Sequence, residues 1–277
     1  MDGLLAAAIV HRFFQGDVEC KAVHYGGVVP VELMRGRNVF FVDFAFEFHE
    51  MLPHLDVPRH LTIIDHHEDN MRPWVALDNG TYPNITIFYD QKKSGAGLTW
   101  DYFFGGDKPL LVRYAQEYDL WTKELPCTDE VQSGLRYMFP PREAALAALS
   151  NYIVQAKENE AEELKDIGGI ILREEMTQIE AMIKRHLQHI EFLGYPNIPV
   201  CAMPPELVNQ AGELLYTRYP DAPFVVMFED NYPKNTRKYS FRSRRNGGAN
   251  VSEIAAKIGG KGHENSSGAL VACIFNI

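Results

Sequence analysis

Cysteine is scarce in this 277-residue sequence, and no two cysteines form a CxxC pair. The chain therefore has neither the signature of a zinc knuckle nor that of a disulfide-stapled secreted domain. The apolar stretch Leu4–Val10 is too short to cross a bilayer, and it lacks the basic flank and cleavage site of a signal peptide. We expect buried thiols, a cytoplasmic location and no membrane partner. The four cysteines are Cys20, Cys127, Cys201 and Cys273.

Positive charge is also in deficit. Lys and Arg number 27 against 37 Asp and Glu, which gives a formal net charge of −10. This balance argues against a protein that coats long nucleic acids by bulk electrostatics. One local exception is the stretch Lys234–Arg245, which holds six basic residues and no acid. The stretch fits either a solvated cationic edge or a local site for an anion.

Motifs of nucleotide-driven and covalent catalysis are missing. The sequence has no GxxxxGK[ST] phosphate loop, and no pattern supports a serine or cysteine triad. No period of roughly 20 to 50 residues recurs, so a repeat architecture is not expected. Hydrophobic residues nevertheless make up 46% of the chain, as in ordinary globular proteins. The length is sufficient for two domains.

Helical and strand-like segments alternate in the first part of the chain. Short β-branched and aromatic runs, separated by helical patterns, predict an α/β fold with a largely parallel sheet covered on both faces. The expected strands are Val18–Val23, Asn38–Val42 and Leu61–Ile64, and the expected helices include Leu4–Phe14, Phe46–Leu55, Gly97–Phe104 and one that begins at Pro109.

The second half predicts a helical region followed by a smaller α/β domain. The region Arg142–Leu193 is charged and almost entirely helical, with an interruption only at the pair Gly168–Gly169. Strands near Ile198–Met203 and Ala269–Phe275 bound the last segment. We expect two lobes joined by a helical linker: an N-terminal parallel-sheet domain over residues 1–150, a connector over 151–195 and a C-terminal α/β domain over 196–277.

Acids and histidines stand at the ends of predicted strands. Asp43 closes Asn38–Val42, Asp65-His66-His67 closes Leu61–Ile64, and Asp2 precedes the first helix. Ligands of open parallel sheets bind outside the carboxyl ends of the strands, so these groups should converge. Each alone fits a helix cap or a turn. Together, carboxylates and imidazoles suit a divalent ion such as manganese.

Five ordered motifs resemble the DHH phosphoesterase superfamily, in its oligoribonuclease and RecJ-like branch with a C-terminal DHHA1 domain. They are Met1–Ala6, Val42-Asp43-Phe44, Asp65-His66-His67 after Thr62-Ile63-Ile64, Tyr118-Asp119-Leu120-Trp121, and Ser240–Ser243 together with Gly259–Gly268.

The resemblance implies a role for each matched residue. Two metal ions, usually Mn²⁺ with Mg²⁺ or Co²⁺ as alternatives, would be held by Asp2, Asp43, His66 and Asp119, with Asp43 as the bridge. His67 would contact the substrate phosphate, and Asp65 would orient the neighbouring imidazole.

The C-terminal domain of the resemblance implies a second set of residues. Arg242, Gly260, Gly262 and His263 would bind the substrate, with the glycine-rich turn Gly259–Gly262 bringing backbone N–H groups to an anion.

The first motif departs from the family pattern. A strand, a histidine and an aspartate normally precede the position that Asp2 matches, whereas this sequence begins at Met1. We expect a start assigned too late, with the first strand of the sheet missing. As written, the chain is expected to bind one metal better than two and to hydrolyse slowly.

The predicted activity is metal-dependent hydrolysis of phosphodiester or phosphomonoester bonds in short oligonucleotides or small nucleotides. A catalytically weakened nucleotide-binding or regulatory protein is the alternative from another class, and a RecJ-like single-strand exonuclease is the enzymatic alternative. Pyrophosphate hydrolysis is disfavoured, because the C-terminal turn resembles DHHA1. Apolar spacing in Arg142–Leu193 fits either packing within its own domain or a homodimer.

Overall fold

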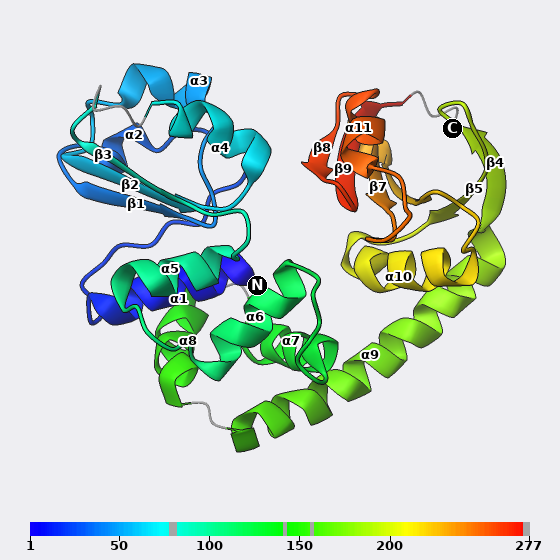
Figure 1. The fold of residues 1–277 in the computed structure, drawn as a ribbon, viewed down its shortest axis with the longest axis horizontal. Helices are drawn as coiled ribbons and strands as arrows, with labels where there is room; N and C mark the ends of the chain where they lie inside the picture. Colours follow the sequence, from blue (N-terminus) through cyan, green and yellow to red (C-terminus); the bar gives the residue numbers. More distant parts are fainter. Residues whose placement is uncertain (78–81, 141–142, 156–157, 274–277) are drawn as a thin grey trace. The chain divides into compact units, whose positions relative to one another are not determined.

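The computed structural model describes residues 1–77, 82–140, 143–155 and 158–273. They form two compact units, Met1–Ile171 and Leu172–Ile277, and each unit contains its own β-sheet (Figure 1). The predicted mixed α/β class is confirmed. Among the described residues, no helix is both long enough and apolar enough to cross a membrane.

The sheet of the first unit has three parallel strands in the order β1-β2-β3. The central strand is buried from its second residue onward, because its β-branched and apolar side chains are covered on both faces. The predicted strands near residues 38–42 and 61–64 are confirmed, and a third was not predicted. The strands are β1 (Asn38–Val42), β2 (His60–Asp65) and β3 (Ile85–Tyr89).

Helices cover both faces of this sheet (Figure 1). On one face, Leu5 and Ile9 of α1 pack with Ala96 of α5. On the other, Met51 and Trp74 pack against Ile63. The helices are α1 (Asp2–Phe13) and α5 (Gly95–Phe103) on the first face, and α2 (Val31–Met34), α3 (Phe48–Met51), η1 (Leu52–His54) and α4 (Glu68–Val75) elsewhere in this unit.

The strand predicted at Val18–Val23 is wrong. These residues have no regular secondary structure. A strand needs a neighbour to satisfy its backbone groups, and β1 pairs only with β2 among the described strands. β-branched content alone therefore gave a false signal here.

The helical part of the first unit is continuous through the glycine pair that was expected to interrupt it. Gly168 lies inside a single helix of 29 residues, α9. Its missing side chain lets α9 pack closely against α7. A Cβ at Gly168 would overlap the carbonyl of Glu130, and a Cβ at Gly134 would overlap that of Leu164. The helices are α6 (Leu110–Asp119), α7 (Thr128–Met138), α8 (Glu143–Gln155) and α9 (Glu158–His186), of which α9 continues into the second unit.

The second unit is built on a mixed six-stranded sheet in the order β4-β5-β6-β7-β9-β8, and among these described strands only β5 and β6 pair in parallel. Residues of α10 pack on Met227, and residues of α11 pack on Phe241. The elements are β4 (Gln188–Phe192), β5 (Tyr195–Ala202), η2 (Pro205–Leu207), α10 (Val208–Arg218), β6 (Val225–Asn231), η3 (Tyr232–Lys234), β7 (Thr236–Arg242), α11 (Val251–Ala256), β8 (Lys261–His263) and β9 (Ser266–Ala272).

Strand β4 corrects the prediction that the helical region runs to Leu193. The chain reverses through a two-residue turn in which Leu193 and Gly194 both have positive φ, 51° and 86°. Such a turn joins antiparallel strands, and Phe192 pairs with Tyr195 across it. Leucine is an uncommon residue at positive φ, so the usual hairpin signal is missing from these residues. The end of the strand predicted at Ala269–Phe275 lies outside the described residues.

Candidate metal centre

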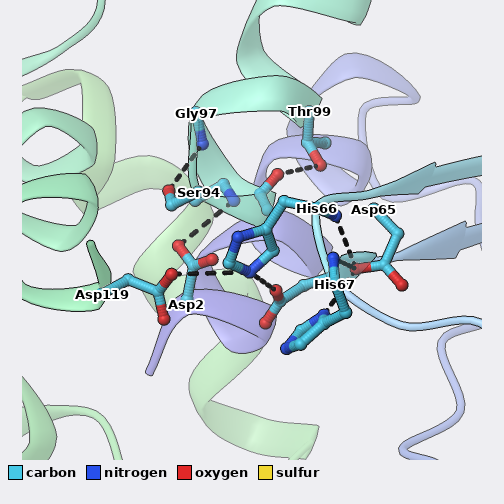
Figure 2. A network of polar contacts seen from close by, with 11 residues as sticks. Asp2, Asp65, His66, His67, Ser94, Gly97, Thr99 and Asp119 are labelled. Carbon is cyan, nitrogen blue, oxygen red and sulfur yellow. Dashed lines mark hydrogen bonds and ion pairs between the residues drawn. The ribbon is translucent and has the colours of Figure 1, made fainter. Parts of the chain in front are cut away.

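Acids and histidines converge at the carboxyl edge of the first sheet (Figure 2). Asp43 follows β1, and Asp65 ends β2 with two histidines directly after it. Asp2 begins α1 and Asp119 ends α6, so four different elements supply the cluster. The arrangement follows from parallel pairing, because Val42 lies opposite Ile64 and both strands therefore end at the same edge.

Asp43 occupies a special backbone position. Its φ is 54°, a left-handed conformation that Asp and Asn tolerate better than most residues. Its amide still donates to the carbonyl of Ile64 at 2.9 Å, so the chain leaves the sheet only at this residue. A Cβ at Gly95 would overlap the Asp43 side chain, and one at Gly3 would lie 3.0 Å from its Oδ2. Two glycines therefore make room for this carboxylate.

Asp65 organises the two histidines. Its side chain is fully buried, and Oδ1 accepts hydrogen bonds from the amides of His66 at 2.8 Å and His67 at 3.4 Å. The same oxygen lies 2.7 Å from Nδ1 of His67. With Nδ1 held by a carboxylate, the His67 ring has a fixed orientation and its Nε2 faces away from Asp65.

His66 is buried between two carboxylates. Its Nε2 lies 3.3 Å from Oδ1 of Asp43 and 3.4 Å from Oδ2 of Asp119. Asp2 completes this side of the cluster, where its Oδ1 accepts a hydrogen bond of 3.2 Å from the amide of Ala96 in the first turn of α5. The positive end of the α5 dipole thus points at a carboxylate.

The cluster has a high density of negative charge. Burial raises the pKa of Asp43 well above its ordinary value, and the nearby charges of Asp2 and Asp119 raise it further. Burial and the charge of Asp2 likewise raise the pKa of Asp119 to about 6. Burial alone would lower the pKa of His67, but its hydrogen bond to Asp65 and the charge of that carboxylate outweigh burial, and the pKa is raised.

The donor set fits a divalent cation. One ligand atom from each of Asp43, Asp65, His66 and His67 lies within 4.8 Å of the others, and the same holds for Asp2, His66 and Asp119. Three buried oxygens, Asp2 Oδ2, Asp43 Oδ1 and Asp65 Oδ2, accept no hydrogen bond from the described residues. Buried carboxylates without donors are costly. A cation among them would remove that cost, and carboxylate with imidazole suits ions of the Mn²⁺ type.

The structure thus brings together all six residues that the sequence singled out in the first unit. The roles given to them, Asp2, Asp43, His66 and Asp119 as metal ligands and Asp65 and His67 in catalysis, stay predictions. Asp65 contacts both histidine amides and the His67 ring, which agrees in geometry with an orienting residue.

Arg242 and His263 lie on one face of the second sheet. Both pair with Ser266, Arg242 across β7–β9 and His263 across β8–β9, and residues directly opposite in a ladder point to the same side. The Arg242 guanidinium donates to Asn209 Oδ1 at 2.7 Å and to its neighbour's carbonyl at 2.8 Å. Its stem packs against α10 where Gly212 has no side chain.

The expected anion-binding turn is not present as predicted. The amides of Gly259 and Gly260 donate to the carbonyls of Ala256 and Ala255 at 3.1 and 2.9 Å. They therefore close the end of α11 rather than face a ligand. A Cβ at Gly260 would also overlap Gly268 of β9, so this glycine has a packing role. Gly262 lies in the edge strand β8 and not in a turn.

Sequence reasoning missed the residues that support Asp2 and Asp43. Ser94 caps α5 by accepting a hydrogen bond from the amide of Gly97 at 3.1 Å, which positions the helix end that donates to Asp2. Gly95 follows directly and packs on Asp43. A serine before a run of small residues is a typical helix start, so this signal was present. It indicated a cap, but not which carboxylate the helix end faces.

The chain is similar in sequence to a viral protein. No family model matches the chain. Uncharacterized protein R106 of Acanthamoeba polyphaga mimivirus is 27% identical over 241 residues, which cover 86% of this chain and 54% of that protein. The chain therefore spans about half the length of this curated relative.

Two solved structures resemble the fold. The pGpG-specific phosphodiesterase PggH from Vibrio cholerae matches with a TM-score of 0.50 and 15% identity, over 98% of this chain and 90% of that one. The DHH domain of a protein described as a member of a family of ribosomal proteins matches with a TM-score of 0.50 and 12% identity, over 84% of this chain and 65% of that one. The chain shares its fold with these two structures, the second of which is described as a DHH domain.

Proposed function

We propose that this chain is a divalent-cation-dependent phosphoesterase that hydrolyses short oligonucleotides or small nucleotides. The observation that carries the proposal is the cluster of buried carboxylates and imidazoles at the carboxyl edge of the parallel sheet. The DHH-superfamily fold supports it, and one structure with this fold is named as a pGpG-specific phosphodiesterase.

The residues of the cluster have different proposed roles, in binding the cation or in contacting the substrate. Asp2, Asp43, His66 and Asp119 would hold the cation, which when bound lowers the pKa of a coordinated water and neutralises phosphoryl charge. His67, with its ring orientation set by Asp65 at 2.7 Å, would donate a hydrogen bond to a phosphoryl oxygen. No protein nucleophile is needed in this arrangement.

The second unit has its own proposed substrate-binding residues. Arg242 has a planar guanidinium that suits phosphate or carboxylate oxygens, and Asn209 holds it in place. His263 stands on the same face, two strands away. We assign both to substrate binding, with a short nucleotide as the ligand class because the chain as a whole is acidic.

The test uses the purified chain with Mn²⁺, Mg²⁺ or Co²⁺ and a panel of substrates: a linear dinucleotide, cyclic dinucleotides, a 3′,5′-bisphosphonucleoside and a longer single-stranded oligomer. We expect hydrolysis of short substrates that EDTA abolishes, and a higher melting temperature when the cation is added. His66→Ala should lose both. The matched control is His49→Ala, which removes a histidine of α3 outside the cluster and should retain both.

Three results would change the proposal. Thermal stabilisation by Mn²⁺ and nucleotide binding without turnover of any substrate would favour a nucleotide-binding or regulatory protein. Preference for the longer oligomer would favour a RecJ-like exonuclease. Equal cation-induced stabilisation of wild type and His66→Ala would exclude the cluster as the metal centre.

A further inference from the structure

Tyr25 is the second residue of a tight turn close to the candidate metal centre. The amide of Gly27 donates to the carbonyl of His24 at 3.0 Å, which closes a four-residue turn. Gly26 has a φ of 75°, the value that the third position of a type II turn requires. The turn thus fixes the backbone of Tyr25, although no strand or helix contains it.

The ring of Tyr25 joins a row of aromatic side chains that leads to the centre. Its centroid lies 4.9 Å from that of Phe44 and 6.4 Å from the imidazole of His67. Phe44 is in turn supported by the buried ring of Phe46 at 5.0 Å. Phe44 directly follows Asp43, so this aromatic row and the carboxylate cluster share one segment of backbone.

Tyr25 is exposed at 42% of its surface, although its neighbours Phe44 and Phe46 are half-buried and buried. A residue that only covered Phe44 would not need to leave so much of an aromatic ring in water. Tyr25 therefore stays accessible to a ligand beside a strongly acidic cluster.

We propose that Tyr25 is a stacking platform for the nucleobase attached to the phosphate that His67 contacts. The inference rests on the proposed function and deepens it by naming the ligand of this surface. Tyr25 presents an exposed aromatic ring beside the imidazole proposed to contact the phosphate, and every base offers a π-face on which such a ring can stack. Stacking on one ring is tolerant of base identity. Binding at Tyr25 should therefore require a base but discriminate little between different bases.

The test compares two substrates that differ only in one base. One is a dinucleotide, and the other carries an abasic sugar at the nucleotide whose phosphate is cleaved. In Tyr25→Ala, the KM of the complete dinucleotide should rise about tenfold, from the loss of one stacking contact. The KM of the abasic substrate should stay within about twofold, and Tyr25→Phe should behave as wild type on both.

The matched control is Tyr102→Ala. Tyr102 has a similar exposure, 38%, and also packs on phenylalanines, Phe88 at 5.6 Å and Phe103 at 5.0 Å. It lies near the carboxyl end of α5, whereas Asp2 is bonded to the amino end of that helix. Its removal should leave both KM values within about twofold of wild type.

The outcomes separate this inference from the proposed function. If the wild type is active and Tyr25→Ala changes both substrates equally, or neither, the platform is refuted while the enzyme stands. If the wild type binds nucleotides without turnover, the Kd of the two ligands replaces KM and the same differences are expected. A wild type that neither hydrolyses nor binds nucleotides in the presence of Mn²⁺ overturns both.

Discussion

Gly95 and Asp43 are packed so closely that a single added methyl group at Gly95 would overlap the Asp43 side chain. Gly95 lies in the first turn of α5, whereas Asp43 directly follows β1. Their contact fixes the position of the carboxylate that also lies against Gly3 and His66.

Substitution Gly95→Ala should therefore damage the centre without harming the helix. Alanine has a better helix propensity than glycine, so any loss comes from displacement of Asp43. We expect Mn²⁺ affinity, measured by calorimetry, to fall about tenfold or more, as for other residues that position metal ligands.

Gly97→Ala is the control on the same helix. A Cβ there would meet the end of the Gln116 side chain, which can rotate away. Mn²⁺ affinity should stay close to that of wild type. Equal losses in the two variants would mean that α5 as a whole, and not the Gly95–Asp43 contact, determines the affinity.

Asp43→Asn should stabilise the metal-free protein while removing its response to metal. Asparagine tolerates the same positive φ, and the change removes one charge from a crowded cluster. We expect the metal-free melting temperature at pH 7.5 to rise by about 2–4 °C, equivalent to roughly 1 kcal/mol. Added Mn²⁺ should raise the melting temperature of wild type but not that of the variant.

The crowding of charge around Asp43 also predicts how the stability of the metal-free protein changes with pH. The folded-state pKa of Asp43 is raised, so the folded protein binds more protons than the unfolded chain between the ordinary aspartate pKa of about 4 and the raised value. The metal-free wild type should then lose stability as pH rises through this window. The difference from Asp43→Asn should vanish near pH 4, and a difference that grows on acidification would contradict this assignment.

Asp65→Asn should reduce catalysis more than metal binding. The substitution disturbs the oxygen that accepts from both histidine amides and holds Nδ1 of His67. We expect kcat to fall about 10- to 100-fold, with most of the Mn²⁺-induced thermal stabilisation retained. Loss of that stabilisation to the extent seen with His66→Ala would make Asp65 a direct ligand instead.

Gly168→Ala should destabilise the first unit. A Cβ at this position overlaps the backbone carbonyl of Glu130, and backbone cannot move aside as a side chain can. We expect a loss of about 1–3 kcal/mol in unfolding free energy from denaturant titration. Ile170 is exposed on the same helix, so Ile170→Ala should change the unfolding free energy by less than about 0.5 kcal/mol. A neutral Gly168→Ala would refute the close packing of α7 and α9.

Strand ends were readable from the sequence because two local signals coincide there. Runs such as Asn38–Val42 are β-branched and aromatic, and the acids directly after them fit no continued strand. Parallel topology then brings those acids to one edge. For this reason the sequence alone predicted that Asp43 and Asp65 lie close together.

Contacts that depend on distant partners could not be read in this way. Gly168 resembles a helix break until the carbonyl of Glu130 is known to lie against it. Val18–Val23 resembles a strand until the pairing of the described strands is known. Tyr25 gave no signal, since a lone tyrosine in a turn acquires meaning only from the rings of Phe44 and His67 beside it.

Helix α9 belongs to two hydrophobic cores at once. Leu164 is buried with α1, α5 and α6 residues of the first unit, whereas Ile179 and Ile183 are buried with Met203 and Leu215 of the second. The division between the units, at Ile171 and Leu172, falls inside this uninterrupted helix. A recombination breakpoint at this boundary would cut α9 in two. We therefore expect the two units to be inherited together in related proteins, and not to be exchanged as separate modules.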